Sequence, residues 1–333
     1  MPDIRLESRP ETIIAAKYEP ATLPFPNIGA RQEIVFDLGI TLHEGHIHIT
    51  GLILKGVHGH QLLFEQRWTA QMLMQHTGES DLEIEAGMGL AVRCLHVLHH
   101  AHQPLTEVEV VVLSATIGSD ETHQNSLTIP VRFHEQKTDL HFPLRGAWWA
   151  IQASDWSDQH KIEAFSQTYA LDFVKLGENN QIYKNEGLTL EDHYSWDQPV
   201  YATAGGKVAH VFYDMPDLTP GIPPNPLMFR DDARRVLGNA VAISHANGEF
   251  SYYGHLQQAS IQVNVGDLIK RGTLLGKVGN SGHSPGPHLH FHMMEGPNLF
   301  FDQGLPVQFS HFSAGGQRFD QLTTIPTRMI VHG

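Results

Sequence analysis

The 333-residue chain has one cysteine, Cys94, so no disulfide can form within it. No stretch approaches the roughly 20 consecutive apolar residues that a membrane-spanning helix needs. The N-terminal stretch, MPDIRLESRPETIIAAKYEP, contains no apolar run of signal-peptide length. We therefore expect a soluble protein with no transmembrane segment, no disulfide framework and no visible signal peptide.

Positive charge is also scarce, because 22 Lys and Arg face 36 Asp and Glu and the formal net charge is −14. A protein that binds nucleic acid needs an excess of Lys and Arg to neutralise phosphates, so we expect no nucleic-acid partner. Hydrophobic residues make up 41% of the chain and charged residues 17%, which is typical of a globular protein. The length allows two domains, each with its own core.

Long helical periodicity is scarce throughout the first part of the chain. Residues 1 to about 30 are predicted to form an extended arm. From there to residue 140, short apolar and alternating segments such as EIVFDLGITL, HIHITGLIL and TEVEVVVLSATI predict strands, and QRWTAQMLMQHT is the best candidate for a short helix. Residues 1–140 are therefore predicted to be an arm plus a β-sandwich-like domain. We find no nucleophile or metal-ligand set there, so its role is open, with binding or packing favoured.

The second part, residues 141–333, is predicted to be an all-β domain, so the whole chain is expected to be mainly β. Strand signals occur in TYALDFVKL, PVYATAGGKVAHVFY, NAVAISHANG and FSYYGHL. The five prolines of MPDLTPGIPPNPLMFRDD predict a loop between two of these strands. Evenly spaced glycines in VGDLIKRGTLLGKVG predict turns between short β segments.

Histidine, by contrast, is abundant, with 24 residues. In GNSGHSPGPHLHFHMMEG, His288, His290 and His292 alternate with Leu289 and Phe291. If this segment is a strand, the three imidazoles share one face and the apolar side chains share the other. The histidine face is then either a metal and proton-transfer site or a wet surface. The histidines in LHEGHIHI and CLHVLHHAH are expected to be strand residues that face solvent or the other domain.

Three stretches in the order FSYYGHL, VGDLIKRGTLLGKVG and GNSGHSPGPHLHF resemble the lysostaphin/LytM-type zinc metalloendopeptidases, which cleave peptide bonds in bacterial peptidoglycan. PVYATAGGKV is also similar to a strand pair of that family, and YALDF resembles a divergent branch of it. The resemblance covers about residues 145–310. It implies a lysostaphin-type peptidase fold for the second domain.

The resemblance implies that His290 is a zinc ligand and that His255 and His288 are catalytic. A catalytic zinc keeps three protein ligands and an open position, where it acidifies a water molecule and polarises a carbonyl group. Two nearby imidazoles can then accept the proton of that water and stabilise the oxyanion. His283, in the turn, and His292 are expected to be rim residues.

Two pairs of residues are candidates for the remaining zinc ligands. His193 and Asp197, in HYSWD, have the His-x-x-x-Asp spacing of the family, but Asp197 lies two residues before Pro199, where a turn is expected. Asp172 lies in an apolar strand, where a carboxylate must be paired or bound to a metal. In the divergent branch a histidine upstream completes the set, which here is His160. We favour His160 and Asp172, with His193 and Asp197 as the alternative.

The resemblance therefore implies a zinc-dependent endopeptidase with one Zn²⁺ ion and a peptide or peptidoglycan substrate. The alternative is a metal-free, peptidase-like module used in binding or regulation, because a clean His-x-x-x-Asp motif is missing. The retention of His255, His288 and His290 together favours the enzyme. The family implies a periplasmic or extracellular location, whereas the absence of a visible signal peptide leaves the cytoplasm open.

Overall fold

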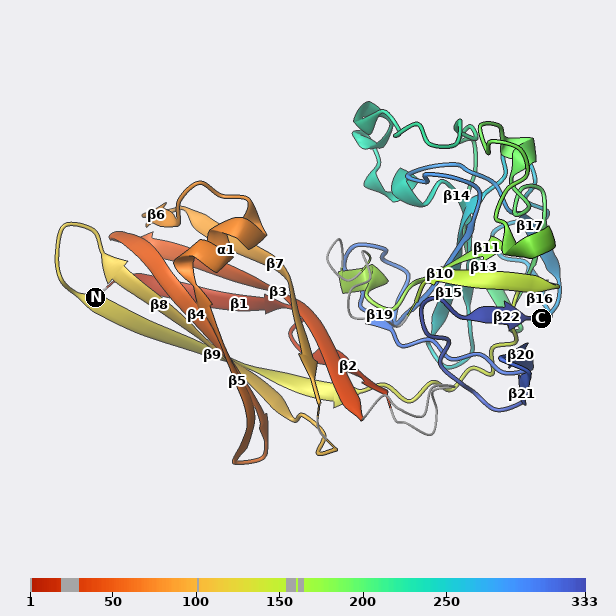
Figure 1. Ribbon diagram of the computed structural model, residues 1–333. Helices are drawn as coiled ribbons and strands as arrows, with labels where there is room; N and C mark the ends of the chain where they lie inside the picture. Colours follow the sequence, from red (N-terminus) through yellow and green to blue (C-terminus); the bar gives the residue numbers. More distant parts are fainter. Residues whose placement is uncertain (1, 19–29, 101, 154–159, 161–164) are drawn as a thin grey trace. The chain divides into compact units, whose positions relative to one another are not determined.

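The computed structural model describes residues 2–18, 30–100, 102–153, 160 and 165–333. These residues divide into two compact units (Figure 1). Described residues before 135, together with Phe165, belong to the first unit, and the other described residues belong to the second. Among the described residues, no helix has the length and apolar character to cross a bilayer.

The first unit is a nine-stranded arrangement with one short helix, α1 (Ala70–Thr77). Its strands are β1 (Asp3–Arg9), β2 (Ile13–Tyr18), β3 (Arg31–Glu44), β4 (His46–His58), β5 (Gln61–Thr69), β6 (Glu83–Glu85), β7 (Gly89–His99), β8 (Glu107–Thr116) and β9 (Thr122–Phe133). Strand β2 pairs with β3 on one side and runs parallel to β9 on the other. The segment predicted as an arm therefore contributes two paired strands, β1 and β2.

Alternating apolar residues bury one side of these strands, as the sequence predicts. On β8, for example, Val108, Val110 and Val112 are buried in a core that also takes side chains from β3, β4 and β7. The predicted helix is confirmed as α1, where the Thr69 hydroxyl accepts a hydrogen bond from Met72 N and Gly78 ends the helix in the left-handed conformation. Seven of the nine strands form the path β1-β3-β2-β9-β8-β4-β5, while β6 pairs with β4 and β7 pairs with β3 beside it. The packing of two layers as a sandwich stays a prediction.

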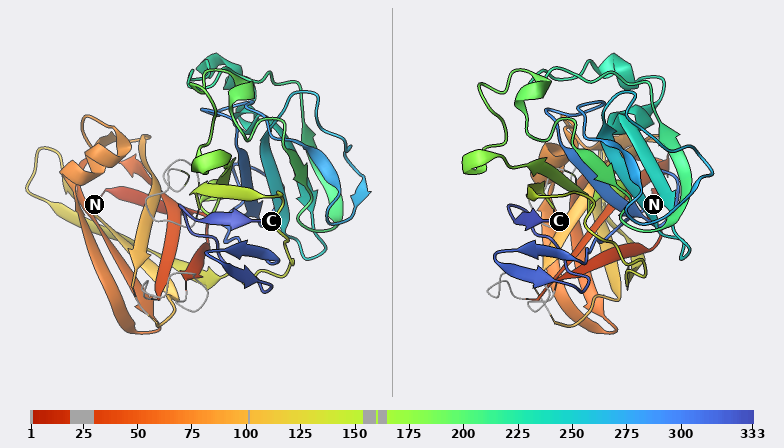
Figure 2. Two further views of the ribbon diagram at one scale, coloured as in Figure 1. Left: turned by 45° about the vertical axis from the view of Figure 1, so that its right-hand side comes forward. Right: turned by 90° about the vertical axis from the view of Figure 1, so that its right-hand side faces the viewer.

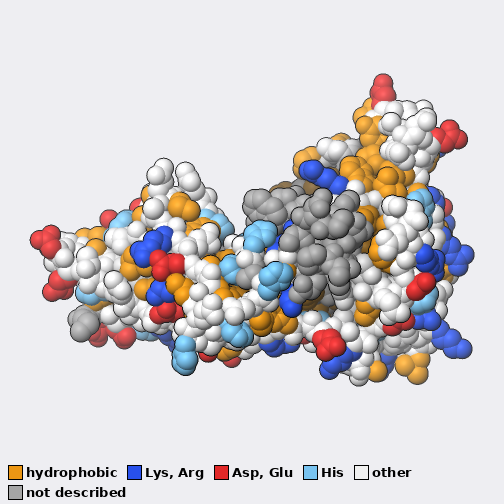
Figure 3. Space-filling view, turned by 60° about the horizontal axis from the view of Figure 1, so that its bottom comes forward, with side chains coloured by type: hydrophobic (Ala, Val, Ile, Leu, Met, Phe, Trp, Pro, Cys, Tyr) orange, Lys and Arg blue, Asp and Glu red, His pale blue; other side chains and the backbone are white. Residues whose placement is uncertain are grey.

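Most histidines of the two clusters in the first unit lie at or near the surface. Of these, His43, His100 and His102 are exposed and the other four are partly buried, and Figure 3 shows histidine side chains, in pale blue, on one face of the molecule. His96 differs, because its Nε2 lies 2.8 Å from Oε1 of the buried Glu33. The expectation of solvent-facing histidines is therefore met at three of the seven positions, and the other four are partly buried.

The second unit is built on an eleven-stranded sheet with the path β16-β13-β14-β15-β18-β11-β10-β22-β20-β21 and β19 beside β18 (Figure 2). Its strands are β10 (Ala147–Gln152), β11 (Leu171–Lys175), β13 (Gly206–Phe212), β14 (Asn239–Ser244), β15 (Phe250–Leu256), β16 (Leu268–Ile269), β18 (Leu289–Met294), β19 (Gly304–Leu305), β20 (Phe312–Ala314), β21 (Gln317–Phe319) and β22 (Ile330–His332). A separate pair is formed by β12 (Pro199–Tyr201) and β17 (Leu274–Lys277). Both units are thus β-rich, and the mainly β fold is confirmed.

Strand β18 lies between β15 and β11, and all six of its residues are buried. Its neighbours place Gly254 of β15 and Asp172 of β11 opposite His290. Phe291, one residue along, contacts Tyr253 and Phe309 through ring edges and faces. The strand therefore has one aromatic face and one histidine face, as the alternation of the sequence predicts.

The proline-rich segment after β13 is a loop with two short 3-10 turns, η5 (Pro226–Phe229) and η6 (Ala233–Leu237). Asp217 attaches it to the segment that leads into β18, since its carboxylate accepts hydrogen bonds from Asn280 N at 2.7 Å and Gln258 N at 2.8 Å. Gly221 N also donates to Pro285 O at 2.8 Å. The loop therefore packs along the chain that positions the histidine strand.

Candidate metal and catalytic site

Asp172 and His290 face each other across the β11–β18 pair. Their register makes them direct neighbours, and Asp172 Oδ1 accepts a hydrogen bond from His290 Nδ1 at 2.9 Å. His160 Nε2 approaches the other carboxylate oxygen, Oδ2, at 3.4 Å. One potential ligand atom from each of the three residues lies within 4.8 Å of the others. The structure therefore brings together the favoured trio of His160, Asp172 and His290.

His288 and His255 lie beside this trio. His288 Nε2 is 3.6 Å from Asp172 Oδ1. The His255 ring centroid lies 4.7 Å from that of His288 and 5.6 Å from that of His290. The two histidines that the resemblance assigns to catalysis therefore lie on the same face as the trio, close enough to act on one reacting group.

Backbone carbonyl groups fix the orientation of both rings. His255 Nδ1 donates to Ser281 O at 2.8 Å, and His288 Nδ1 donates to Gly286 O at 2.8 Å. Each ring thus carries its proton on Nδ1 and keeps the lone pair of Nε2 available to accept another. His255 holds this position with a φ of 57°, a left-handed conformation that a residue with a side chain adopts only when its surroundings enforce it.

His292 was predicted to be a rim residue, and that prediction is wrong. Its side chain is fully buried, its Nδ1 lies 2.9 Å from His290 Nε2, and its ring stacks on Tyr252 at 4.8 Å with an interplanar angle of 4°. The alternation of the sequence already places His292 on the face of His290, but only the packed neighbours show that this face is internal at both positions. His283 is exposed, as expected.

The alternative ligand pair lies elsewhere. Asp197 has a φ of 62°, which is typical of a turn, and its carboxylate pairs with Lys277 Nζ at 2.8 Å. Both side chains are half exposed, at 50% and 40%. His193 Nε2 donates to Gly187 O at 3.0 Å, and its ring packs against Tyr183. Asp197 is therefore engaged in a surface ion pair, away from the buried carboxylate–imidazole group.

The charges of the site follow from its burial. Burial by itself would raise the pKa of Asp172, but the facing His160, His288 and His290 lower it well below its usual range. Burial lowers the pKa of His255, and the neighbouring His288 and His290 lower it further. Asp172 is therefore ionised and His255 and His290 are neutral at neutral pH, and an ionised carboxylate and a neutral imidazole are the forms that bind a metal.

The residues present fit a zinc ion. Two imidazoles and one carboxylate, supplied by His160, His290 and Asp172, match the His/Asp donor sets of catalytic zinc sites. The second nitrogen of His290 is engaged by His292, an outer contact of the kind that orients metal-binding histidines. The carboxylate is also buried without Lys or Arg among the partners that lower its pKa, so a cation would complete its charge balance.

A protein-family comparison matches residues 184–302 to peptidase family M23. Among curated proteins, the DD-carboxypeptidase/endopeptidase Mpg of Neisseria meningitidis serogroup B (strain ATCC 13091 / M2091) is 49% identical over 55 residues, which are 16% of this chain and 12% of Mpg. The peptidoglycan DD-endopeptidase ShyC of Vibrio cholerae is 37% identical over 57 residues, 17% of this chain and 13% of ShyC. The cell division protein DipM of Caulobacter vibrioides is 29% identical over 124 residues, 37% of this chain and 16% of DipM.

Two solved structures are similar to about half of this chain. The catalytic domain of lysostaphin from Staphylococcus simulans is 19% identical, with 50% of this chain and 88% of that chain covered and a TM-score of 0.25. The M23 metalloprotease pseudoalterin is 18% identical, with 58% and 100% covered and a TM-score of 0.32. TM-scores this low carry no structural argument, so the comparison depends on the sequence match. The chain also spans only 12% to 16% of the three curated relatives named above.

The family match includes three of the site residues, His255, His288 and His290, and confirms the resemblance to lysostaphin/LytM-type enzymes. His160 and Asp172 lie before the matched segment, so the geometry alone connects them to it. Residues 184–302 therefore resemble peptidase family M23.

Proposed function

We propose that the second unit is a zinc-dependent endopeptidase that hydrolyses peptide bonds in peptidoglycan. One observation carries the proposal. A buried carboxylate, Asp172, faces the imidazoles of His160 and His290 with potential ligand atoms within 4.8 Å, and His255 and His288 lie beside them. This combination supplies both a metal-binding trio and two further proton acceptors.

In this proposal His160, Asp172 and His290 hold the zinc ion. When bound, the ion lowers the pKa of a water molecule toward about 7 and polarises the carbonyl group of the substrate. Asp172 supplies the negative charge of the site. When His290 Nδ1 serves as a ligand, His290 Nε2 carries the proton and donates a hydrogen bond to His292 Nδ1.

His255 and His288 handle the proton and the developing charge. Because the carbonyl groups of Ser281 and Gly286 hold the protons on Nδ1, the two Nε2 atoms are free to accept a proton from the attacking water. The lowered pKa of His255 keeps this imidazole neutral at neutral pH. Once protonated, a neighbouring imidazole stabilises the oxyanion of the tetrahedral intermediate and then donates to the leaving amine.

The substrate class comes from the relatives. The Neisseria protein is named as a DD-carboxypeptidase/endopeptidase and the Vibrio protein as a peptidoglycan DD-endopeptidase, and their matches to this chain are 55 and 57 residues long. We therefore assign the stem or bridge peptides of peptidoglycan as the substrate and a compartment in contact with the cell wall as the place of action.

The test combines metal analysis with hydrolysis of purified peptidoglycan. Asp172→Asn keeps the size of the side chain but removes the charge, and His290→Ala removes a ligand, so each should lose zinc and reduce kcat/KM by about 10³-fold or more. Asp197→Asn is the matched control, because it removes a carboxylate from the surface pair with Lys277. A protein that binds no zinc, or a His290→Ala variant that keeps both zinc and activity, would exclude the proposal.

The second candidate is a metal-free binding or regulatory module, and the burial of the site favours it. The exposed fractions are 1% for His290, 4% for Asp172, 4% for His288 and 5% for His255. Hydrogen bonds to imidazoles can keep a buried carboxylate ionised without a metal. In that case peptidoglycan binding would survive treatment with a chelator, and no hydrolysis would be detected before or after it.

A further inference from the structure

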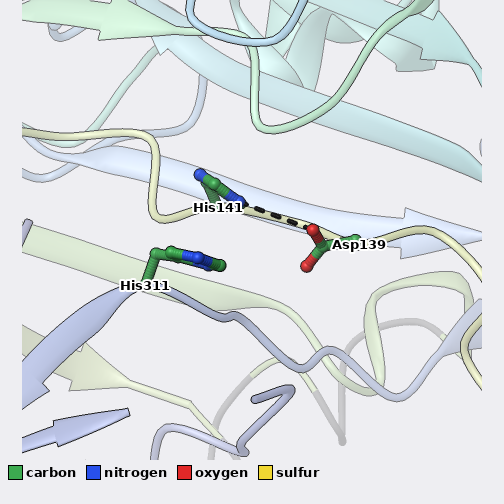
Figure 4. Close-up of side chains that lie close together, drawn as sticks. All are labelled: Asp139, His141 and His311. Carbon is green, nitrogen blue, oxygen red and sulfur yellow. Dashed lines mark ion pairs between the residues drawn. The ribbon is translucent and has the colours of Figure 1, made fainter. Parts of the chain in front are cut away.

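A second group of potential metal ligands lies in the same unit. It consists of Asp139, His141 and His311, whose potential ligand atoms lie within 4.8 Å of one another. Figure 4 shows the two imidazoles one above the other, with the Asp139 carboxylate at their edge. The ring centroids are 4.0 Å apart. Asp139 and His311 are exposed, and His141 is half-buried.

His141 Nε2 is the atom that most clearly indicates an ion-binding site. The atom has almost no exposure and no hydrogen-bond partner among the described residues, and Asp139 Oδ2 lies 3.5 Å away. That separation corresponds to a long ion pair rather than a close hydrogen bond. It is close to the roughly 3.3 to 3.5 Å expected between two ligands of a tetrahedral zinc ion with bonds of about 2.0 to 2.1 Å. The pair therefore leaves room for a cation.

The backbone around the group is fixed by hydrogen bonds. His141 N donates to Thr203 O at 2.9 Å, and Ser310 N donates to Leu140 O at 2.8 Å. The Ser310 hydroxyl donates to Asp139 Oδ1 at 2.6 Å and lies 2.9 Å from His311 Nδ1. Ser310 therefore orients both the carboxylate and one imidazole, as outer contacts do in metal sites.

This group is separate from the first trio. Phe142, next to His141, packs edge-on against Phe173 at 5.1 Å and Phe309 at 5.7 Å, and Phe309 contacts Phe291. Phe173 and Phe291 lie on the face of the sheet opposite to the neighbouring Asp172 and His290. An aromatic layer therefore lies between the two groups.

We propose that Asp139, His141 and His311 form a second site for a divalent transition metal ion of the zinc type. Two imidazoles and a carboxylate suit such an ion, and exposure leaves its fourth position to water. The ion would join the segment that enters the second unit to the segment before β20. Because the unfolded chain lacks this arrangement, binding would stabilise the folded unit.

The positive charge of Arg271 weakens binding of a metal ion at the proposed second site. Its Nη1 lies 3.2 Å from Asp139 Oδ2, the same oxygen that faces His141. A guanidinium group competes with a cation for that oxygen and repels it. Removal of this charge should therefore tighten metal binding, an effect that damage to the fold would not produce.

The loss-of-function experiment measures zinc stoichiometry and affinity on the full chain, by elemental analysis and by titration with zinc chloride. His311→Ala should bind about one zinc ion fewer than the wild type, whatever the first site holds. His332→Ala is the matched control, since it removes an exposed histidine of the same unit that lies on β22. Equal zinc binding by His311→Ala and the wild type, or an equal loss in His332→Ala, would overturn the proposal.

The gain-of-function experiment uses Arg271→Gln. Its zinc affinity at the second site should rise by about two- to fivefold, the effect expected when a competing exposed ion pair is removed. The melting temperature in the presence of zinc should rise more for this variant than for the wild type. An unchanged or weaker affinity would show that Asp139 is not a ligand.

Discussion

Both ring nitrogens of His290 have a hydrogen-bonding neighbour. Its Nδ1 faces Asp172 at 2.9 Å, and its Nε2 faces His292 Nδ1 at 2.9 Å. A metal-binding imidazole keeps its orientation and tautomer only when its second nitrogen has a partner. The neighbour at the second nitrogen is therefore expected to matter almost as much as the ligand itself.

His292→Phe tests this positioning role. The phenyl ring can keep the stack on Tyr252, but it cannot hydrogen-bond His290 Nε2. We expect zinc affinity at the first site to fall by about 10- to 100-fold, measured by competition with a chelator of known affinity. His283→Phe, at an exposed position near the same strand, should leave the affinity unchanged. Wild-type affinity in His292→Phe would show that the contact has no role in metal binding.

The sequence indicates some residues of this site but not others. Asp172 stands in an apolar strand, so its need for a partner follows from the cost of burying a carboxylate. His160 has no comparable signal, and only the resemblance to a divergent branch suggests it. The burial of His292 depends on which strands cover β18, and the local sequence does not contain that information.

At the scale of elements, the turn before β18 is built on close contact between two glycines. Gly282 has a φ of 78°, and a Cβ added to it would overlap with the backbone of Gly238. Gly238, at a φ of 64°, would in turn overlap with Ser281. This contact fixes the segment that includes Ser281, whose carbonyl group orients His255.

Gly282→Ala should therefore destabilise the chain strongly. It incurs the cost of a left-handed conformation and also a backbone clash, together more than about 3 kcal/mol. Gly272→Ala is a matched control, because Gly272 has a φ of 79° and no atom within 4 Å of an added Cβ. That variant should lose only about 1 to 2 kcal/mol. Urea unfolding measures both values, and equal losses would contradict the packing argument.

Most elements follow from periodicity and turn residues. The alternation of β8 and the apolar segments of β11, β14 and β15 are visible in the sequence, and these strands lie where they are predicted. The pairing of β2 with β3 and β9 is not visible, because strands distant in sequence choose their partners through the global topology. This is why the first 18 residues looked like an arm.

At the scale of the whole molecule, buried neutral histidines should make stability depend on pH. Burial lowers the pKa of His255, His290 and His292 below the usual range of an imidazole, and the neighbouring histidines lower it as well, although Asp172 opposes the shift. Below about pH 6.5 the unfolded chain binds protons that these residues cannot accept in the folded state. Stability therefore falls as pH falls. Asp172 stays ionised in both states through this range, so it does not contribute to the slope.

The metal-free protein should show this effect between about pH 6.5 and pH 5, with a slope of up to about 1.4 kcal/mol per pH unit for each histidine. Denaturant unfolding of chelator-treated protein at a series of pH values measures it. His292→Phe removes one such histidine and should reduce the slope by up to about 1.4 kcal/mol per pH unit. A stability that is constant or higher at the acidic end would show that these histidines are protonated in the folded state.

The sequence by itself determines the β-rich character of both units, the histidine face of β18 and the resemblance of the second unit to peptidase family M23, because these depend on residue types at short spacing. Tertiary structure decides which carboxylate meets that face. Asp197 has the expected spacing but lies in a surface ion pair, whereas Asp172, 118 residues before His290, is its direct neighbour across two strands. Strand order and register set that contact, and they depend on the packing of the whole unit.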